Sequence, residues 1–130
     1  MKQYIEQTQN DLFADRQLRL MIENGNRQVV GIVDLCSFDP LHNRAEVGIM
    51  VDKSCRRQGI GRNALALLEE HCFRYLGIHQ LFAYIAVENL PSRRLFAACG
   101  YKESAVLKEW AHTFGGGYTD VLVVQKLNLS

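Results

Sequence analysis

Hydrophobic and polar residues follow two different spacings along this chain, and each spacing predicts one kind of element. Alternation with a period of two, or a short apolar run, predicts strands over 16–22, 28–38, 44–51, 79–87, 101–113 and 118–127. Apolar residues at helical spacing predict a helix over 63–75, and shorter helices are expected over 4–13 and 89–99. This order of elements predicts an α+β fold with a mixed sheet, in a single domain covering 1–130.

Turn residues mark the connections between these elements. Asn24 and Gly25 predict a hairpin between the first two strands, and the glycines at 115–117 predict another between the last two. Gly77 is expected to close the long helix. Gly100 is expected to end the short helix in the left-handed conformation, which glycine adopts without a steric penalty.

A basic, glycine-containing turn separates the strand at 44–51 from the helix at 63–75. It reads Arg56-Arg57-Gln58-Gly59-Ile60-Gly61-Arg62. A turn that opens a helix presents free backbone N–H groups at the positive end of the helix dipole, and glycines let an anion approach the backbone closely. The segment therefore predicts a phosphate site. The structural alternative is an ordinary basic surface turn.

Two common phosphate motifs do not fit this turn. A P-loop needs Gly-Lys followed by Ser or Thr, and the chain contains no such triplet. A dinucleotide fingerprint should follow the first strand and place an acidic residue about 20 positions on. Here the turn follows the third predicted strand, Ala64 stands where the last glycine is expected, and the strand at 80–86 offers no acid before Glu88.

A second motif lies at 89–101 and reads Asn-Leu-Pro-Ser-Arg-Arg-Leu-Phe-Ala-Ala-Cys-Gly-Tyr. Asn89 and Ser92 are polar residues at the mouth of a short helix, where side-chain oxygens cap backbone N–H groups. Pro91 suits the first helical turn, and Leu95 and Phe96 are expected to face inward. Read alone, the motif also fits a self-capped surface helix, with Arg93 and Arg94 on its solvated face.

Together, the two motifs resemble those of the GNAT N-acetyltransferases. Arg56-x-x-Gly59-x-Gly61 matches the family's R/Q-x-x-G-x-G/A signature, and 89–101 matches N-x-x-S-x-x-L-[YF]-x-x-x-G-[FY]. The tail at 107–122 resembles the closing hairpin of the spermidine and ribosomal-protein N-acetyltransferase branch. The resemblance implies a GNAT fold that lacks the family's usual first strand and helix. The strand at 16–22 is then expected to have an unpaired edge, which a partner chain would cover unless the chain is a truncated form.

The resemblance also implies acetyl-CoA as cosubstrate and a role for each matching residue. Pantetheine would bind the backbone of Ile49, Met50 and Val51, although these residues also fit an ordinary core strand. Asn89, Ser92 and Phe96 would contact the pantetheine arm and the reacting end, with Asn89 counted as catalytic. The pyrophosphate would bind the N–H groups of Arg56, Arg57, Gln58, Gly59, Ile60, Gly61 and Arg62.

The implied reaction is acetyl transfer to an amine. An alkylammonium has a pKa near ~10.4, so about one molecule in 10³ is neutral at pH 7 and a positioned base helps. Glu46 stands where many family members use a Glu through water; its structural alternative is an exposed glutamate paired with Arg44. Phe96 occupies the position of the usual general acid, a Tyr. Tyr101, Tyr118 and Cys99 are the candidates to replace it.

Composition limits the classes of partner and cofactor that this chain is expected to bind. The formal net charge of +1 gives no general attraction to nucleic acid or membrane, and no apolar run approaches the length of a membrane span. Four cysteines without a C-x-x-C pair suggest reduced thiols in a cytoplasmic protein. The four histidines have no metal-ligand spacing, so no metal is expected. A homo-oligomer is left open.

Three functions follow from these observations. The first is an N-acetyltransferase acting on a polyamine, another small amine or a protein N-terminus, with Glu46, Glu103, Glu109 and Asp120 as candidate acids of a polyamine site. The second is a non-catalytic acyl-CoA-binding regulatory module, suggested by Phe96 and the short N-terminus. The third, a nucleic-acid binder using the basic turn, is disfavoured by the net charge.

Overall fold

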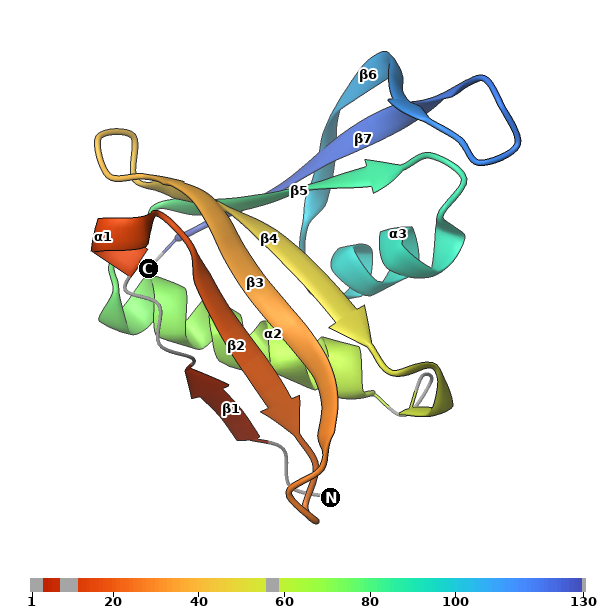
Figure 1. The fold of residues 1–130 in the computed structure, drawn as a ribbon. Coiled ribbons are helices and arrows are strands. Elements are labelled where there is room, and N and C mark those ends of the chain that lie inside the picture. Colours follow the sequence, from red (N-terminus) through yellow and green to blue (C-terminus); the bar gives the residue numbers. More distant parts are fainter. Residues whose placement is uncertain (1–3, 8–11, 56–58, 130) are drawn as a thin grey trace.

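The computed structural model describes residues 4–7, 12–55 and 59–129. The described strands form one mixed sheet in the order β1-β2-β3-β4-β5-β7-β6 (Figure 1). Their bounds are β1 Tyr4–Gln7, β2 Leu18–Glu23, β3 Val29–Asp39, β4 Arg44–Val51, β5 Gln80–Ala86, β6 Lys102–His112 and β7 Tyr118–Leu127. The helices are α1 Leu12–Asp15, α2 Ile60–Glu70 and α3 Leu90–Ala98, with a 3-10 turn at Lys53–Cys55 and a π-helical turn at His71–Tyr75. The predicted α+β fold with a mixed sheet is confirmed.

The sheet has two halves that meet at β4 and β5. Strands β1 to β4 are antiparallel neighbours, and β5, β7 and β6 form a second antiparallel group. The two groups are joined by a parallel contact between β4 and β5. In the described part of the chain β6 lies at one edge, with irregular register near Glu103 and between Leu107 and Ala111.

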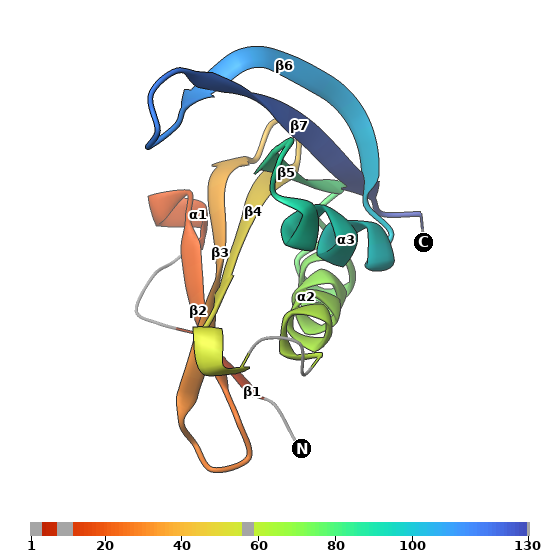
Figure 2. The same ribbon diagram turned by 90° about the vertical axis from the view of Figure 1, so that its right-hand side faces the viewer.

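Helices α2 and α3 lie on the same side of the sheet (Figure 2). Alternate residues of the strands, such as Leu20, Val33 and Val47, are buried on that side in the main core with Leu65 and Leu68 of α2. The intervening residues of β2, β3 and β4 lie on the other side, which we call the open face. Its residues are Arg19, Met21, Ile32, Asp34, Cys36, Glu46, Gly48 and Met50.

A bulge in β3 changes the alternation near the end of that strand. Ser37 has φ of 52°, and the pairing with β4 shifts between Cys36 and Asp39. A bulge adds one residue to a strand, so the next side chain changes face. Phe38 consequently packs into the core, with 6% of its surface exposed, although strict alternation would have placed it beside Cys36 on the open face.

The predicted helix at 4–13 is wrong. Residues Tyr4–Gln7 form β1, which pairs antiparallel with β2, and only Leu12–Asp15 are helical. A ten-residue helix has little stability of its own, whereas pairing with β2 supplies ladder hydrogen bonds to a Tyr-Ile segment of high strand propensity. The expected unpaired edge of the strand at 16–22 is wrong for the same reason, because β1 covers it.

The other boundaries agree with the predicted elements to within a few residues. Helix α2 begins at Ile60, earlier than the predicted 63, and the π-helical turn carries it to Tyr75. Gly77 and Gly100 have φ of 66° and 90°, and Gly100 therefore ends α3 in the predicted left-handed conformation.

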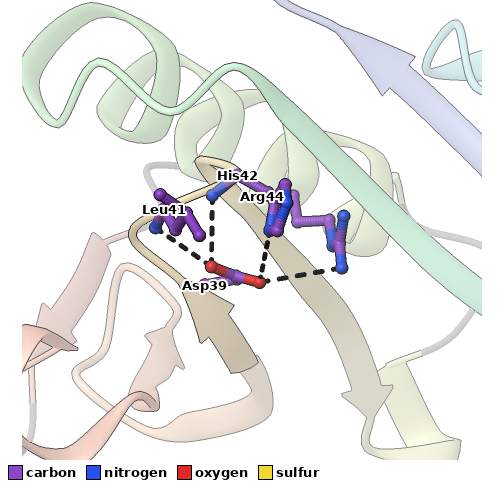
Figure 3. Close-up of polar contacts among 4 residues, drawn as sticks. All are labelled: Asp39, Leu41, His42 and Arg44. Carbon is purple, nitrogen blue, oxygen red and sulfur yellow. Dashed lines mark hydrogen bonds and ion pairs between the residues drawn. The ribbon is translucent and has the colours of Figure 1, made fainter.

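The turn between β3 and β4 is built around the Asp39 carboxylate (Figure 3). That carboxylate accepts hydrogen bonds from the backbone N–H groups of Leu41 and His42, and it pairs with the His42 ring at 2.9 Å and with Arg44 at 3.7 Å. Asn43 in the same turn donates from its side chain to the Gly77 carbonyl at 2.7 Å. The turn thereby holds the start of β4 beside the start of β5.

Replacing Asp39 by asparagine is expected to remove a pH-dependent part of the stability. Hydrogen bonding to the His42 side chain, with backbone N–H groups of the turn, holds the pKa of the Asp39 carboxyl below its ordinary value. A depressed pKa stabilises the fold above the ordinary value of about 3.9, and this contribution is lost as pH falls through the lower pKa of the folded state. Melting temperatures of both proteins between pH 2 and pH 6 should therefore converge in acid; a constant difference would contradict this account.

Candidate functional site

Strands β4 and β5 separate after a short parallel contact. Paired positions run only from Arg44 opposite Gln80 to Glu46 opposite Phe82. Beyond this point β4 continues to Val51 on its partner β3, and β5 continues to Ala86 on its partner β7 (Figure 1). The facing backbone edges of β4 and β5 therefore diverge, and past Glu46 the two strands share no paired positions. An extended ligand can pair with a strand edge of this kind.

The first turn of α2, the end of β4 and the middle of α3 meet at the wide end of this divergence. A Cβ atom at Gly61 would lie 3.2 Å from a Leu95 methyl carbon of α3 and 3.7 Å from a Val51 methyl carbon of β4. Gly61 therefore allows α2 to approach both elements closely. We expected this glycine to admit an anion, and the structure adds a packing role for it.

The N-terminus of α2 lacks a side-chain cap. Gly59 is the N-cap residue, with φ of 76°, and it provides no side chain to accept from the first-turn N–H groups. Such groups form an anion site together with the helix dipole. Ile60 is buried against Ala64, whereas Arg62 is exposed beside the helix start. Arg56, Arg57 and Gln58 lie outside the described residues.

The start of α3 is capped as the sequence predicts. The Asn89 side-chain oxygen accepts from the Ser92 backbone N–H at 3.3 Å, and Pro91 lies in the first turn. The prediction for Arg93 is wrong. Its guanidinium donates to the Val87 carbonyl at 2.9 Å and pairs with Glu103 of β6, so it joins α3 to the turn after β5 and to one strand.

Glu46 lies on the open face at the last paired position before β4 and β5 separate. Directly across on β3 is Cys36, and burial, together with the charge of Glu46, raises the pKa of the Cys36 thiol. The alternative pairing with Arg44 is not found, because Arg44 pairs with Asp39 instead. Glu46 makes no ion pair with any described residue, and it is half-buried beside the diverging strands. This position gives a carboxylate access to a ligand on β4.

Phe96 is buried, with 4% of its surface exposed, and meets Tyr101 edge to face with 4.9 Å between ring centres. Burial, and to a lesser degree the charge of Glu69, raises the pKa of Tyr101. The Tyr101 hydroxyl has no hydrogen-bond partner among the described residues. The charges that act on it come from Glu69 of α2, Cys72 of the π-helical turn and Cys99 at the end of α3.

The other two candidate acids contact elements other than β4. Tyr118 meets His112 edge to face where β6 and β7 begin to form the exposed hairpin. The Cys99 thiol lies 4.0 Å from the Arg62 carbonyl oxygen, and burial raises its pKa. The contacts described for the three sequence-derived acids are thus with Phe96, His112 and Arg62, and none of these three partners belongs to β4.

Replacing Tyr101 by phenylalanine is expected to leave activity within about twofold and to change the free energy of unfolding by no more than about 1 kcal/mol. The reason is that the hydroxyl is buried without a described partner, so its removal breaks no hydrogen bond that the structure shows. Steady-state kinetics and urea unfolding would check both. A loss of turnover of tenfold or more would identify Tyr101 as the proton donor after all.

The proposed acids of a polyamine site are not brought together. Glu103 pairs with Arg93, and Asp120 of β7 pairs with Lys108 at 3.2 Å and accepts from the Glu109 backbone N–H at 2.9 Å. These residues lie on the β6–β7 side of the sheet, whereas Glu46 lies on β4.

Sequence reasoning missed two features near β4. One is Gly31 of β3, where a Cβ atom would lie 2.6 Å from the Met50 carbonyl oxygen; a glycine inside a predicted strand was the available signal. The other is an ion pair between Arg19 and Asp34 on the open face. It depends on the register between strands, which single-sequence patterns do not give.

Within the described ranges, no three His, Cys, Asp or Glu side chains are grouped so that they could hold a metal ion. Of the helices that the structure describes, none is long and apolar enough to cross a membrane.

Comparison with known proteins identifies relatives of this chain. The family model described as Acetyltransferase (GNAT) domain matches residues 1–102. A curated relative, the spermidine N(1)-acetyltransferase of Vibrio cholerae, is 27% identical over 103 residues. The match covers 79% of this chain but 59% of that relative, so the chain spans little more than half of its length.

Solved structures give the same assignment. A chimera of the Vibrio cholerae spermidine N-acetyltransferase SpeG and hSSAT superposes with a TM-score of 0.85 at 25% identity, covering 90% of this chain and 70% of that one. A dodecameric structure of spermidine N-acetyltransferase from Vibrio cholerae superposes with a TM-score of 0.83 at 25% identity, covering 90% of this chain and 68% of that one.

Proposed function

Because this chain belongs to the GNAT acetyltransferase family, we propose that it transfers the acetyl group of acetyl-CoA to a primary amine by direct attack in a ternary complex. The observation that carries the proposal is the divergence of β4 and β5 next to the uncapped N-terminus of α2. One feature offers backbone groups to an extended arm, and the other offers N–H groups to a phosphate. Acetyl-CoA carries both chemical groups.

In this proposal, each part of acetyl-CoA binds a different group of residues. Pantetheine binds the backbone of Ile49, Met50 and Val51, where β4 has parted from β5. The pyrophosphate binds the first turn of α2, from Gly59 to Arg62, together with Arg56, Arg57 and Gln58, which precede this turn in the sequence. Asn89, Ser92 and Phe96 of α3 face the pantetheine arm and the reacting end.

The chemistry then requires a neutral amine next to the thioester. Glu46 takes the ammonium proton, directly or through a water molecule, and the amine attacks the carbonyl carbon. A C–N bond forms, the C–S bond breaks, and the nitrogen loses its second proton to water. CoA leaves as a thiolate, which then takes a proton from water. Backbone N–H groups of β4 stabilise the oxyanion. The thiol pKa of about 8.5 makes the leaving group acceptable without a tyrosine donor, which suits the presence of Phe96.

A polyamine is the preferred acceptor among the amines considered. The support is that a curated relative and solved neighbours are named as spermidine acetyltransferases. Other small amines and protein N-termini are the alternative acceptors, and the activity assay described below includes them. As in its dodecameric neighbour, we propose that copies of this chain associate, which light scattering during size-exclusion chromatography would test.

Phe96 favours one alternative function, a regulatory module that binds acyl-CoA without turning it over. This residue stands where the family usually has its tyrosine acid. The alternative predicts tight binding of acetyl-CoA with no amine-dependent release of CoA.

Release of free thiol from acetyl-CoA would decide between the two functions. The assay uses a panel of polyamines, aminoglycosides and N-terminal peptides, with acetyl-CoA binding measured by calorimetry on the same protein. Release that depends on one class of amine supports the enzyme. Binding without release above hydrolysis supports the regulatory module. Absence of acetyl-CoA binding would refute both.

A further inference from the structure

An ion pair crosses two neighbouring strands of the open face close to β4. Arg19 of β2 lies directly opposite Asp34 of β3, and Asp34 lies directly opposite Gly48 of β4. The contact between the two charged groups is bidentate, with Arg19 Nε donating to one carboxylate oxygen at 2.8 Å and Nη2 to the other at 3.2 Å. The three residues therefore form a row across the sheet.

Gly48 leaves the space in front of β4 open to this carboxylate. A Cβ atom there would lie 4.0 Å from the Asp34 Cβ, so the glycine is not required for packing between the strands. Asp34 is one strand spacing, about 4.8 Å, from the strand proposed to hold the thioester. Glu46, the proposed base, lies on the same face two residues before Gly48.

The surface is hollowed on both sides of the pair. One hollow of about 270 Å³ is lined by Arg19, Asp34 and Gly48 with the apolar residues Ile32, Ile49 and Met50. A second, of about 300 Å³, also contains Arg19 and Asp34 in its lining. A carboxylate next to an apolar wall matches an alkylammonium, whose methylene groups contact the wall while its charge binds the acid.

The ion pair is accessible and exchangeable. The exposed fractions of the Arg19 and Asp34 side chains are 56% and 32%. Solvent screens an ion pair at such exposure, although the bidentate geometry makes this pair stronger than most surface pairs. A second cation that reaches Asp34 therefore competes with Arg19 for the same carboxylate.

We propose that Asp34 binds the distal ammonium group of a diamine or polyamine acceptor, and that Arg19 occupies the same carboxylate as a stand-in for that ammonium until the acceptor arrives. The inference rests on the proposed acetyltransferase function and names its specificity-determining residue. Three to four methylene groups span roughly one strand spacing, so the other nitrogen of a short diamine reaches β4 beside Gly48. Glu46 is the diagonal neighbour of Asp34, about 7–8 Å away, and can take the proton of that nitrogen through a water molecule. A monoamine has no group for Asp34 to bind.

The test compares 1,4-diaminobutane with 1-aminobutane as acceptors at neutral pH. Asp34→Asn is expected to lower kcat/KM for the diamine about 10- to 100-fold, through KM, and to leave the monoamine unchanged. Arg19→Gln is expected to act in the opposite direction, raising kcat/KM for the diamine about two- to fivefold. An increase of this kind cannot come from a damaged fold.

Asp39→Asn is the matched control. Asp39 lies on the same strand, has the same exposed fraction (33% against 32%) and also pairs with an arginine, but it lies in the turn of Figure 3 and lines neither hollow. The ratio of kcat/KM for the diamine to kcat/KM for the monoamine should be the same in Asp39→Asn as in the unmodified protein. Far-UV circular dichroism of each variant checks that the fold is retained.

The outcomes separate this inference from the proposed function. Equal losses on both amines in Asp34→Asn, or no loss, would overturn the inference and leave the acetyltransferase function standing. If no amine is turned over, the function fails, and calorimetry with 1,4-diaminobutane and CoA still decides the inference. Weaker binding in Asp34→Asn and tighter binding in Arg19→Gln would support it, and equal dissociation constants would overturn it.

Discussion

Glu46→Gln is expected to lower kcat about 10²-fold or more at neutral pH, within the range of general base catalysis. Glu46 lies at the last paired position before β4 and β5 part, and it has no described ion-pair partner that would compete for its carboxylate. Glutamine keeps the shape of the side chain and removes its ability to take a proton. The acceptor must then lose its proton to solvent before it attacks.

The dependence of kcat on pH is a more specific test of Glu46 as a base than the fall in kcat at neutral pH. An alkylammonium has a pKa near 10.4, so the neutral amine becomes abundant as pH approaches that value. The difference between the two proteins should therefore narrow steadily from pH 7 to pH 10. Glu70→Gln, a change on the exposed face of α2, is the control and should stay within about twofold. A loss that is independent of pH would refute the base assignment.

Gly31→Ala is expected to destabilise the protein by roughly 1–3 kcal/mol, the usual cost of overpacking, and to lower kcat/KM on the order of 10²-fold. An added Cβ would meet the Met50 carbonyl oxygen at 2.6 Å and the Val51 Cα at 3.3 Å. Both are backbone atoms of β4, so they cannot rotate away as a side chain would. The strand itself must move, and with it the groups proposed to hold pantetheine.

Urea unfolding and steady-state kinetics of the same samples would measure these two effects, and acetyl-CoA titration would show whether the second comes from weaker binding of the cosubstrate. Gly115→Ala is the matched control, because a Cβ there meets nothing within 4 Å and its φ is not in the left-handed region. Its stability and affinity should match those of the unmodified protein. A Gly31→Ala protein with normal affinity for acetyl-CoA would show that the end of β4 does not hold the cosubstrate.

Local patterns were enough to predict most of the fold. The bounds of β4 and β7, the cap at Asn89 and the left-handed Gly100 all depend on residues close together in the sequence, where periodicity and turn chemistry are informative. The helix predicted at 4–13 is wrong because a long-range contact, and not a local pattern, determines the conformation there. Pairing with β2 decided the conformation of Tyr4–Gln7, and β2 is distant in the sequence.

The residues of the candidate site show the same difference between local and long-range information. Glu46, Gly59 and Asn89 were found because each lies in a recognisable local motif. The ion pair of Arg19 with Asp34, the close approach at Gly31 and the link from Arg93 to Glu103 each join residues from separate elements. Their geometry depends on strand register and helix packing, which no residue spacing along one chain contains.

The irregular edge strand β6 has a consequence for the colloidal behaviour of the protein. An exposed strand with apolar residues such as Val106 and Trp110 is a template for association between chains. Glu109, with φ of 49°, interrupts the regular backbone there, and its N–H group donates to the Asp120 carboxylate. Lys108 adds a charge at the same point. Asp120 therefore protects the edge from aggregation by holding an irregular backbone in place, a role that contributes to solubility at high concentration.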